Sequence, residues 1–135
     1  MSALWDRIYQ TDTSFFGQEP SKFALWCYNL YMKKKNQAKK ILELGCGQGR
    51  DTLFFVSKGI DATALDFSSI AIKGLIKGAN ERNFLNNIHA SIFGPTNKPI
   101  PFSKDEFDAI YSHMFFNMRF TCEQPNTCFK NLEEY

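Results

Sequence analysis

Residues 41–51 read ILELGCGQGRD, and they constrain the fold of this 135-residue chain more than any other segment. An apolar run that carries one acid, Glu43, changes into glycines at alternate positions, Gly45, Gly47 and Gly49, and a helix-compatible stretch follows. A strand, a glycine turn and a helix form the unit with which parallel α/β domains bring their backbone against a cofactor. Glycine suits such a turn because it tolerates positive φ and has no Cβ to hold a ligand away. The segment therefore predicts an α/β domain with a cofactor-binding turn.

The rest of the chain alternates strand-like and helix-like segments. Hydrophobic periodicity and turn residues predict strands at 40–44, 60–65, 87–92 and 107–112, and helices at 20–34, 51–58 and 68–82. Pro20 is expected at the first position of its helix, Ser68 or Ser69 as a cap, and a further short helix after Pro125. Gly74 and Gly78, four residues apart, favour close packing of the third helix on the sheet. This order predicts a Rossmann-like parallel sheet with flanking helices in a single domain over 1–135, with a helical segment at 1–35 and a cofactor-binding α/β core at 36–135.

Composition excludes several classes of function. A hydrophobic content of 44% and an aromatic content of 16% are typical of a folded globular protein. A net charge of +2 gives no strong electrostatic case for a nucleic-acid partner. Four cysteines and two histidines show no metal-ligand spacing, so no metal is expected. With no signal peptide and no membrane-spanning stretch visible, we expect a cytoplasmic protein with reduced thiols and no membrane partner.

The glycine spacing separates two classes of cofactor. A dinucleotide fingerprint needs G-x-G-x-x-G, and its third glycine would fall on Arg50, which is too large for close helix–strand packing. Asp66 stands 21 residues after Gly45 at the end of the second predicted strand, where a carboxylate can accept hydrogen bonds from both ribose hydroxyls of a nucleoside cofactor. NAD-binding domains also use an acid there, so an NAD-dependent oxidoreductase stays an alternative. An aspartate at a helix N-terminus is the purely structural interpretation of Asp66.

The pattern apolar-Glu-apolar-G-x-G-x-G resembles motif I of the class I S-adenosylmethionine-dependent methyltransferases. The resemblance implies that S-adenosylmethionine is the cofactor, that a small molecule accepts the methyl group, and that the chain carries the N-terminal part, about four strands, of that fold. It implies that the glycine loop, here Gly45, Cys46, Gly47 and Gly49, approaches the methionine part, and that Glu43 helps to place the amino group. Phe67, which follows Asp66, is implied to pack on the adenine.

Other segments look like the small-molecule methyltransferases near the tellurite-resistance and thiopurine groups. These segments are 49–52, Gly59, 66–72 and the aromatic N-terminus. The resemblance implies that the N-terminus closes over the cofactor and that Tyr9 and Phe16 line the site; apolar anchoring of the terminus is the alternative. Residues 107–112 are similar to motif IV, whose end faces the methyl group. His113 is therefore the candidate general base and Tyr111 the candidate for orienting substrate, with a bystander role for His113 left open.

Two features depart from the family pattern. The third strand of the family usually ends in an acid that binds the adenine amino group, whereas here Ser91 and Ile92 occupy that place, and the lost charge weakens binding by about 1 kcal/mol. The family sheet has seven strands, and this chain provides four. The fourth strand is then expected to form an exposed edge. We expect self-association through that edge, a longer parent protein or marginal stability, and a non-catalytic cofactor-binding module is the alternative function.

Overall fold

The computed structural model describes residues 2–33, 38–93, 102–103 and 105–113. Its helices are α1 (Ser2–Thr11), α2 (Lys22–Cys27), α3 (Arg50–Ser57) and α4 (Ser69–Glu81), with a π-helix η1 (Tyr28–Met32) and a 3₁₀-helix η2 (Leu85–Asn87). Its strands are β1 (Lys40–Leu44), β2 (Asp61–Asp66), β3 (Ile88–Ile92) and β4 (Ala109–Ser112). All the pairings are parallel, in the order β3-β2-β1-β4. The predicted parallel α/β fold is therefore confirmed.

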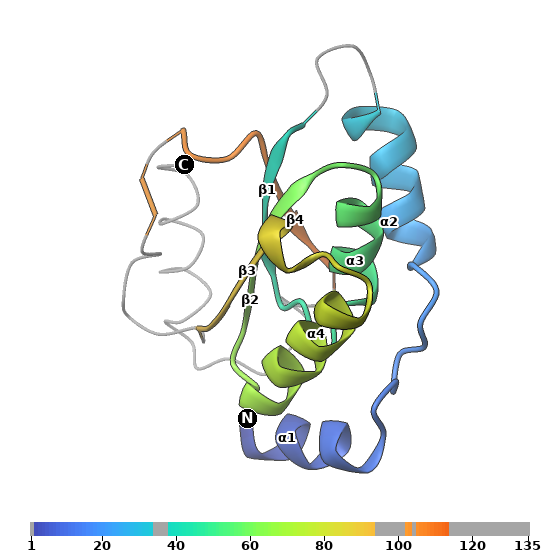
Figure 1. Cartoon of the computed structure of the whole chain (residues 1–135), viewed down its shortest axis with the longest axis vertical. Helices are drawn as coiled ribbons and strands as arrows, with labels where there is room; N and C mark the ends of the chain where they lie inside the picture. Colours follow the sequence, from blue (N-terminus) through green and yellow to red (C-terminus); the bar gives the residue numbers. More distant parts are fainter. Residues whose placement is uncertain (1, 34–37, 94–101, 104, 114–135) are drawn as a thin grey trace, which may run out of the picture.

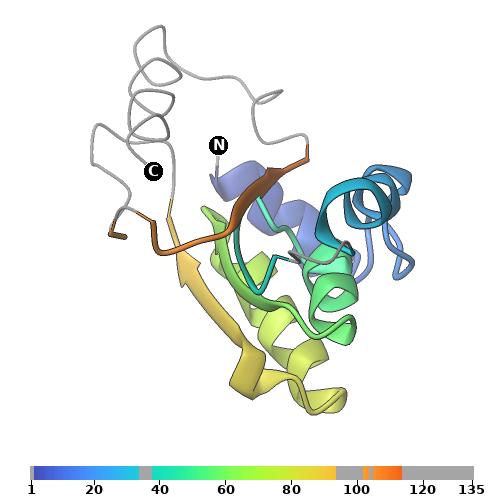
Figure 2. The same ribbon diagram turned by 90° about the horizontal axis from the view of Figure 1, so that it is seen from above.

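Both faces of the central strand β1 are buried, so its sequence shows no polar alternation. Ile41 packs into the large core beneath the helices, while Leu42 and Leu44 belong to a smaller cluster on the opposite face. Successive side chains of a strand point to opposite faces, so Glu43 faces the helices together with Ile41. Figures 1 and 2 show α2, α3 and α4 together on that side of the sheet.

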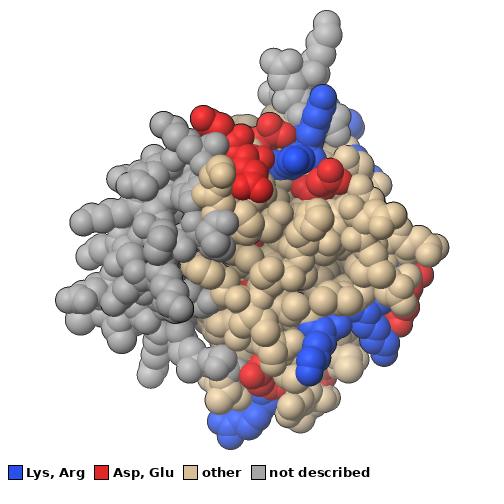
Figure 3. All heavy atoms as spheres, turned by 60° about the vertical axis from the view of Figure 1, so that its left-hand side comes forward, with Lys and Arg blue, Asp and Glu red and all other residues tan. Residues whose placement is uncertain are grey.

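The face of the sheet away from the helices carries an apolar cluster. Leu42, Leu44 and Leu65 form its buried part, and partly buried aromatic side chains pack against them, namely Phe67, Phe93, Phe102 and Phe107. Figure 3 shows the molecule from this side, and uncharged residues cover most of the described surface there. In the part of the chain that the structure describes, no helix is long and apolar enough to cross a membrane.

The strand order places a crevice at the end of β1. The chain passes from β1 to β2 on one side and reaches β4 on the other side. At such a reversal the loops diverge beyond the carboxyl ends of the strands, and ligands of open α/β sheets bind there. The glycine loop 45–49 leaves β1 at this point, which fixes where a site can form.

Several predicted elements differ from the observed ones. The first predicted helix begins at Lys22 and not at Pro20, and Ser21 caps it by accepting a hydrogen bond from the Ala24 N–H at 3.0 Å. This helix continues as the π-helix η1 to Met32. An additional helix, α1, forms among the aromatic residues of the N-terminus, where no individual helix was predicted. The expected helix after Pro125 lies outside the described residues.

The glycines of α4 do not pack on the sheet as predicted. A Cβ on Gly74 would meet Gln48 at 3.7 Å, and one on Gly78 would meet Leu53 at 3.2 Å. The sheet-facing side of α4 carries Ala71, Ile72, Leu75 and Ala79 instead. Small residues thus allow α4 to approach the sheet on one side and the glycine loop and α3 on the other. Ser68 caps the helix, as one of the two predicted alternatives, by accepting from the Ala71 N–H at 3.1 Å.

Candidate functional site

The glycine loop is held against the end of β2 by backbone hydrogen bonds. The N–H groups of Gly45 and Cys46 both donate to the Leu65 carbonyl, at 2.8 and 3.0 Å. Gly45 and Gly47 have φ values of 72° and 55°, in the left-handed region that side chains with a Cβ rarely adopt. The loop therefore needs glycine for its path, and that path brings bare backbone to the crevice.

Gly49 serves packing between helices. It precedes α3 with φ 93°, and a Cβ built on it would lie 2.3 Å from Leu75 Cδ1. Leu75 belongs to α4 and is fully buried. The third glycine of the loop thus allows α4 to press against the start of α3, a packing role like that of the last glycine of a dinucleotide fingerprint.

Glu43 lies buried behind the glycine loop and accepts a hydrogen bond from the Thr52 hydroxyl at 2.5 Å. Burial raises the pKa of Glu43 to about 8, and the negative charges of Asp51 and Asp66 act in the same direction. A positively charged group placed beside Glu43 would favour its ionised form. Burial also raises the pKa of the neighbouring Cys46 thiol, so this thiol is a poor nucleophile.

Asp66, at the end of β2, forms hydrogen bonds to the glycine loop and to the turn before α4. Its Oδ2 accepts from the Gly47 N–H at 2.8 Å, and its Oδ1 accepts from the Ser68 N–H at 2.8 Å. Burial raises the pKa of this carboxyl, while the backbone donors lower it. The Phe67 backbone N–H also donates to this carboxylate, so one of its four acceptor positions stays free. Asp66 therefore has both a structural bond to the loop and capacity for one further donor.

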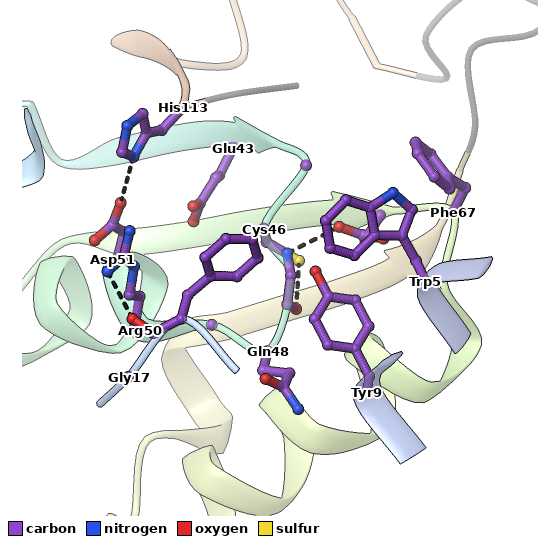
Figure 4. A pocket seen from close by; sticks show the side chains of 15 residues that line it. Trp5, Tyr9, Gly17, Glu43, Cys46, Gln48, Arg50, Asp51, Phe67 and His113 are labelled. Carbon is purple, nitrogen blue, oxygen red and sulfur yellow. Dashed lines mark hydrogen bonds and ion pairs between the residues drawn. The ribbon is translucent and has the colours of Figure 1, made fainter. Parts of the chain in front are cut away.

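The N-terminal segment covers the crevice. Trp5 and Tyr9 of α1 stack with ring centroids 5.5 Å apart, and the Tyr9 hydroxyl lies 3.2 Å from where a Cβ of Gly47 would be. Asp6 binds the start of α4, accepting from the Ser68 hydroxyl at 2.5 Å. The segment is thus packed against the loop, and Figure 4 shows Trp5 and Tyr9 projecting from α1 toward it.

Two residues of the glycine loop and α3 hold the rest of this covering segment. Gln48 accepts from the Phe15 N–H at 3.0 Å and donates to the Asp12 carbonyl at 2.8 Å. Arg50 donates to the Phe16 carbonyl at 2.8 Å, and its guanidinium lies 5.6 Å from the centre of the Phe16 ring. Arg50, whose size is incompatible with a dinucleotide motif, therefore helps to hold the covering segment in place.

These groups enclose one cavity with a volume of about 70 Å³. Most predicted site residues line it: Tyr9, Phe16, Glu43, Gly45, Cys46, Gly47, Gly49, Asp66, Phe67 and His113. Trp5, Gln48, Arg50 and Asp51 also line it and were not predicted (Figure 4). The volume is below that of typical ligand sites, so a ligand of nucleoside size requires the covering segment to shift.

Ser91 and Ile92 lie outside this cavity. Ser91 pairs with Leu65, whose side chain belongs to the opposite face of the sheet, and Ser91 is exposed. Ile92 pairs with Asp66 and is 62% exposed. The structure therefore does not bring Ser91 together with Glu43 and Asp66, and the predicted adenine contacts of both residues stay predictions.

Asp51 is a buried acid that the sequence pattern did not single out. Its Oδ1 accepts from the Ser21 N–H, and its Oδ2 accepts from the Ser21 and Tyr111 hydroxyls, each at 2.7 Å. His113 Nδ1 lies 3.7 Å from the same Oδ2 (Figure 4). The Tyr111 hydroxyl is thus directed at Asp51, and Tyr111 does not line the cavity. The sequence signal that could have identified this cluster is an acid, Asp51, two residues after the glycine loop.

The site as a whole gathers three buried acids, a glycine loop and an aromatic cover. Among the described residues, no group of three histidine, cysteine or acidic side chains could hold a metal ion. The arrangement can accept hydrogen bonds from a polyhydroxylated ligand and can receive a cationic group. It places one histidine at the rim.

Comparisons with known proteins agree with this geometry. A family model described as "Methyltransferase domain" matches residues 41–135. A curated protein of Haemophilus influenzae, "Probable S-adenosyl-L-methionine-dependent methyltransferase TehB", is 30% identical over 96 residues, which are 71% of this chain and 32% of that protein. The chain thus spans about a third of the length of the curated relatives that it matches.

Solved structures show the same fold. TehB from Haemophilus influenzae matches with a TM-score of 0.68 at 24% identity, over 84% of this chain and 36% of that chain. A structure described by the conversion of a disulfide bond into a thioacetal group during echinomycin biosynthesis matches with a TM-score of 0.76 at 19% identity, over 99% of this chain and 55% of that chain. At these identities the likeness concerns the fold alone.

Proposed function

Because the chain belongs to the methyltransferase-domain family of the class I S-adenosylmethionine-dependent enzymes, we propose that it binds S-adenosylmethionine at the glycine loop and transfers its methyl group to a small molecule. The observation that carries the proposal is the pairing of Asp66 with the glycine loop at the strand-order reversal. This pairing holds a carboxylate with a free acceptor position beside bare backbone. Binding and transfer are separate parts of the proposal.

The chemistry of the described residues fits the cofactor. The acceptor position of Asp66 that stays free suits a ribose hydroxyl. Glu43 suits the amino group, because a buried carboxyl with a raised pKa gains an opposite charge there and ionises. Trp5, Tyr9 and Phe67 offer apolar walls for the adenosyl part. The cover must move to admit it, which requires Gln48 and Arg50 to release the hydrogen bonds that hold this segment.

The bound cofactor supplies an activated methyl group on a good leaving group, so orientation of the acceptor supplies much of the catalysis. A base is needed only for an acceptor that arrives protonated. His113 lines the cavity and its side chain is 32% exposed. With Nδ1 turned toward Asp51, its Nε2 is available to take a proton from such an acceptor. Asp51 is a positioning residue in this scheme, and Ser21 and Tyr111 hold it in place.

The enclosed site favours a small acceptor over a macromolecule, because α1 and the segment after it cover the crevice. We also propose a cytoplasmic location, supported by the free thiols of Cys27 and Cys46. The exposed edge of β4 supports self-association: within the described residues, β4 pairs only with β1.

Calorimetry with S-adenosylmethionine, S-adenosylhomocysteine and NAD tests the binding part. We expect the first two to bind and NAD not to bind. Binding of NAD alone would refute the proposal in favour of an oxidoreductase. Methyl transfer to a panel of thiols and amines then tests the second part, and binding without transfer would leave a cofactor-binding module.

A further inference from the structure

A second cavity lies on the other side of the glycine loop, between α4 and the segment 13–18. Its volume is about 460 Å³, within the range of small-molecule sites. Gln48 and Arg50 form part of its wall and separate it from the cavity that contains Glu43 and Asp66. Figure 1 shows the chain after α1 running past α4 and α3 on this side of the molecule. We call this cavity the basic groove.

The shape of the basic groove comes from the solvent-facing side of α4. Lys73, Gly74, Lys77 and Gly78 share this side because residues three and four apart are neighbours on a helix. Glycine has no side chain, so neighbouring residues can lie directly against α4 between the lysines. A Cβ added to Gly78 would lie 3.2 Å from Leu53, and one added to Gly74 would lie 3.7 Å from Gln48. The glycines of α4 therefore let Gln48 and Leu53 lie close against the helix, where both form part of the groove wall.

The charge of the basic groove is strongly positive. Arg50, Lys73, Lys77 and Arg82 line it against one acid, Glu81, which leaves a net charge of +3. The whole chain carries +2, so the remainder is slightly negative. Among the described residues, none of these four cations lies within ion-pair distance of a carboxylate. The cations thus concentrate in one cavity and lack anionic partners there.

Helix electrostatics explain only part of this arrangement. Arg82 stands at the C-cap of α4, where a cation suits the helix dipole. Lys73 lies in the second turn, where the dipole gives no such benefit. Thr13 and Ser14 add hydroxyl groups on the opposite wall of the groove. Lysine, arginine and hydroxyl donors converging on one small cavity are the groups that bind phosphate.

We propose that the basic groove binds a phosphorylated small molecule with at least two negative charges, at a site distinct from the methyl-donor cavity. A small ligand fits better than a nucleic acid, because the net positive charge of the chain lies in this one cavity and the other residues together carry a net charge of −1. The proposal does not depend on methyl transfer.

Titration calorimetry of the whole chain with inorganic pyrophosphate and tripolyphosphate tests this proposal. We expect binding that weakens as salt rises, because salt screens exposed charges. The double variant K73A/K77A should bind at least about tenfold more weakly, since two charge-assisted contacts are lost. The variant K73R/K77R should retain binding, because it keeps both charges.

The matched control is K39A/K40A, which removes the same charge from exposed residues at the start of β1. It should bind like the natural chain. Equal weakening in the control would show a general charge effect and overturn the proposal, as would absence of pyrophosphate binding at millimolar concentration and low salt. Amide NMR shifts should move at Gly74 and Gly78 and stay unchanged at Glu43; the reverse pattern would place the anion in the methyl-donor cavity. Unaltered S-adenosylhomocysteine binding by K73A/K77A separates this test from that of the proposed function.

Discussion

Replacing Gly49 by alanine should destabilise the chain more than the same change at Gly17, Gly47, Gly59, Gly74 or Gly78. The new Cβ would lie 2.3 Å from Leu75 Cδ1, and Leu75 is fully buried, so it has little room to withdraw. Overpacking of this kind costs about 1–3 kcal/mol. The φ of 93° adds roughly 1–2 kcal/mol for a residue with a Cβ. We therefore expect Gly49→Ala to lower the free energy of unfolding by about 2–5 kcal/mol, measured by urea denaturation with circular dichroism.

Gly59→Ala is the matched control for the backbone contribution. Gly59 has a φ of 83°, and a Cβ on it would meet nothing within 4 Å. It should lose only about 1–2 kcal/mol. The double variant Gly49→Ala/Leu75→Ala should be less destabilised than the sum of its single changes by about 1–3 kcal/mol, because the second change removes the clash. If Gly49→Ala cost no more than Gly59→Ala, or if the two changes were additive, the packing role of Gly49 would be refuted.

Three other predictions concern the acids of the site. Asp66→Asn should weaken S-adenosylhomocysteine binding at least about tenfold in calorimetry, by loss of charge assistance, while Asp61→Asn on the same strand should not; equal effects would contradict the ribose role. Burial raises the pKa of Glu43 from 4.5 to about 8 in the folded chain, so between these pH values the native state holds a proton that the unfolded chain has lost. The free energy of unfolding should therefore fall as pH rises through this window, by up to about 1.4 kcal/mol per pH unit. Glu43→Gln should remove this slope in urea titrations at several pH values, and an unchanged slope would show another group to be responsible. Asp51→Asn should cost about 1–3 kcal/mol of stability because three donors lose a charged acceptor, whereas the exposed Asp108→Asn should cost less in the same assay.

Local patterns predicted the elements whose determinants lie within a few residues. The apolar run at 40–44 and the glycines after it predicted β1 and its turn correctly, since burial on both faces requires continuous apolar residues. The N-terminal helix α1 was not predicted as such, because its aromatic residues are placed by contacts with α4 and the glycine loop. The capping role of Ser21 likewise depends on Asp51, thirty residues later in the chain.

The sequence alone determined the fold class and the two anchors of the site, because a glycine loop and an acid at strand ends are local signals with a fixed place in a parallel sheet. Only the tertiary structure decided which residues share the cavity. Strand register turned Ser91 to the opposite face, and the path of the N-terminal segment brought Trp5, Gln48 and Arg50 together. The physical reason is that side-chain direction in a sheet depends on pairing register, and the cover depends on contacts far apart in sequence. Gly49 illustrates both contributions. The glycine spacing of the sequence identifies it as part of the loop, but a glycine is required there because Leu75 of α4 packs against it.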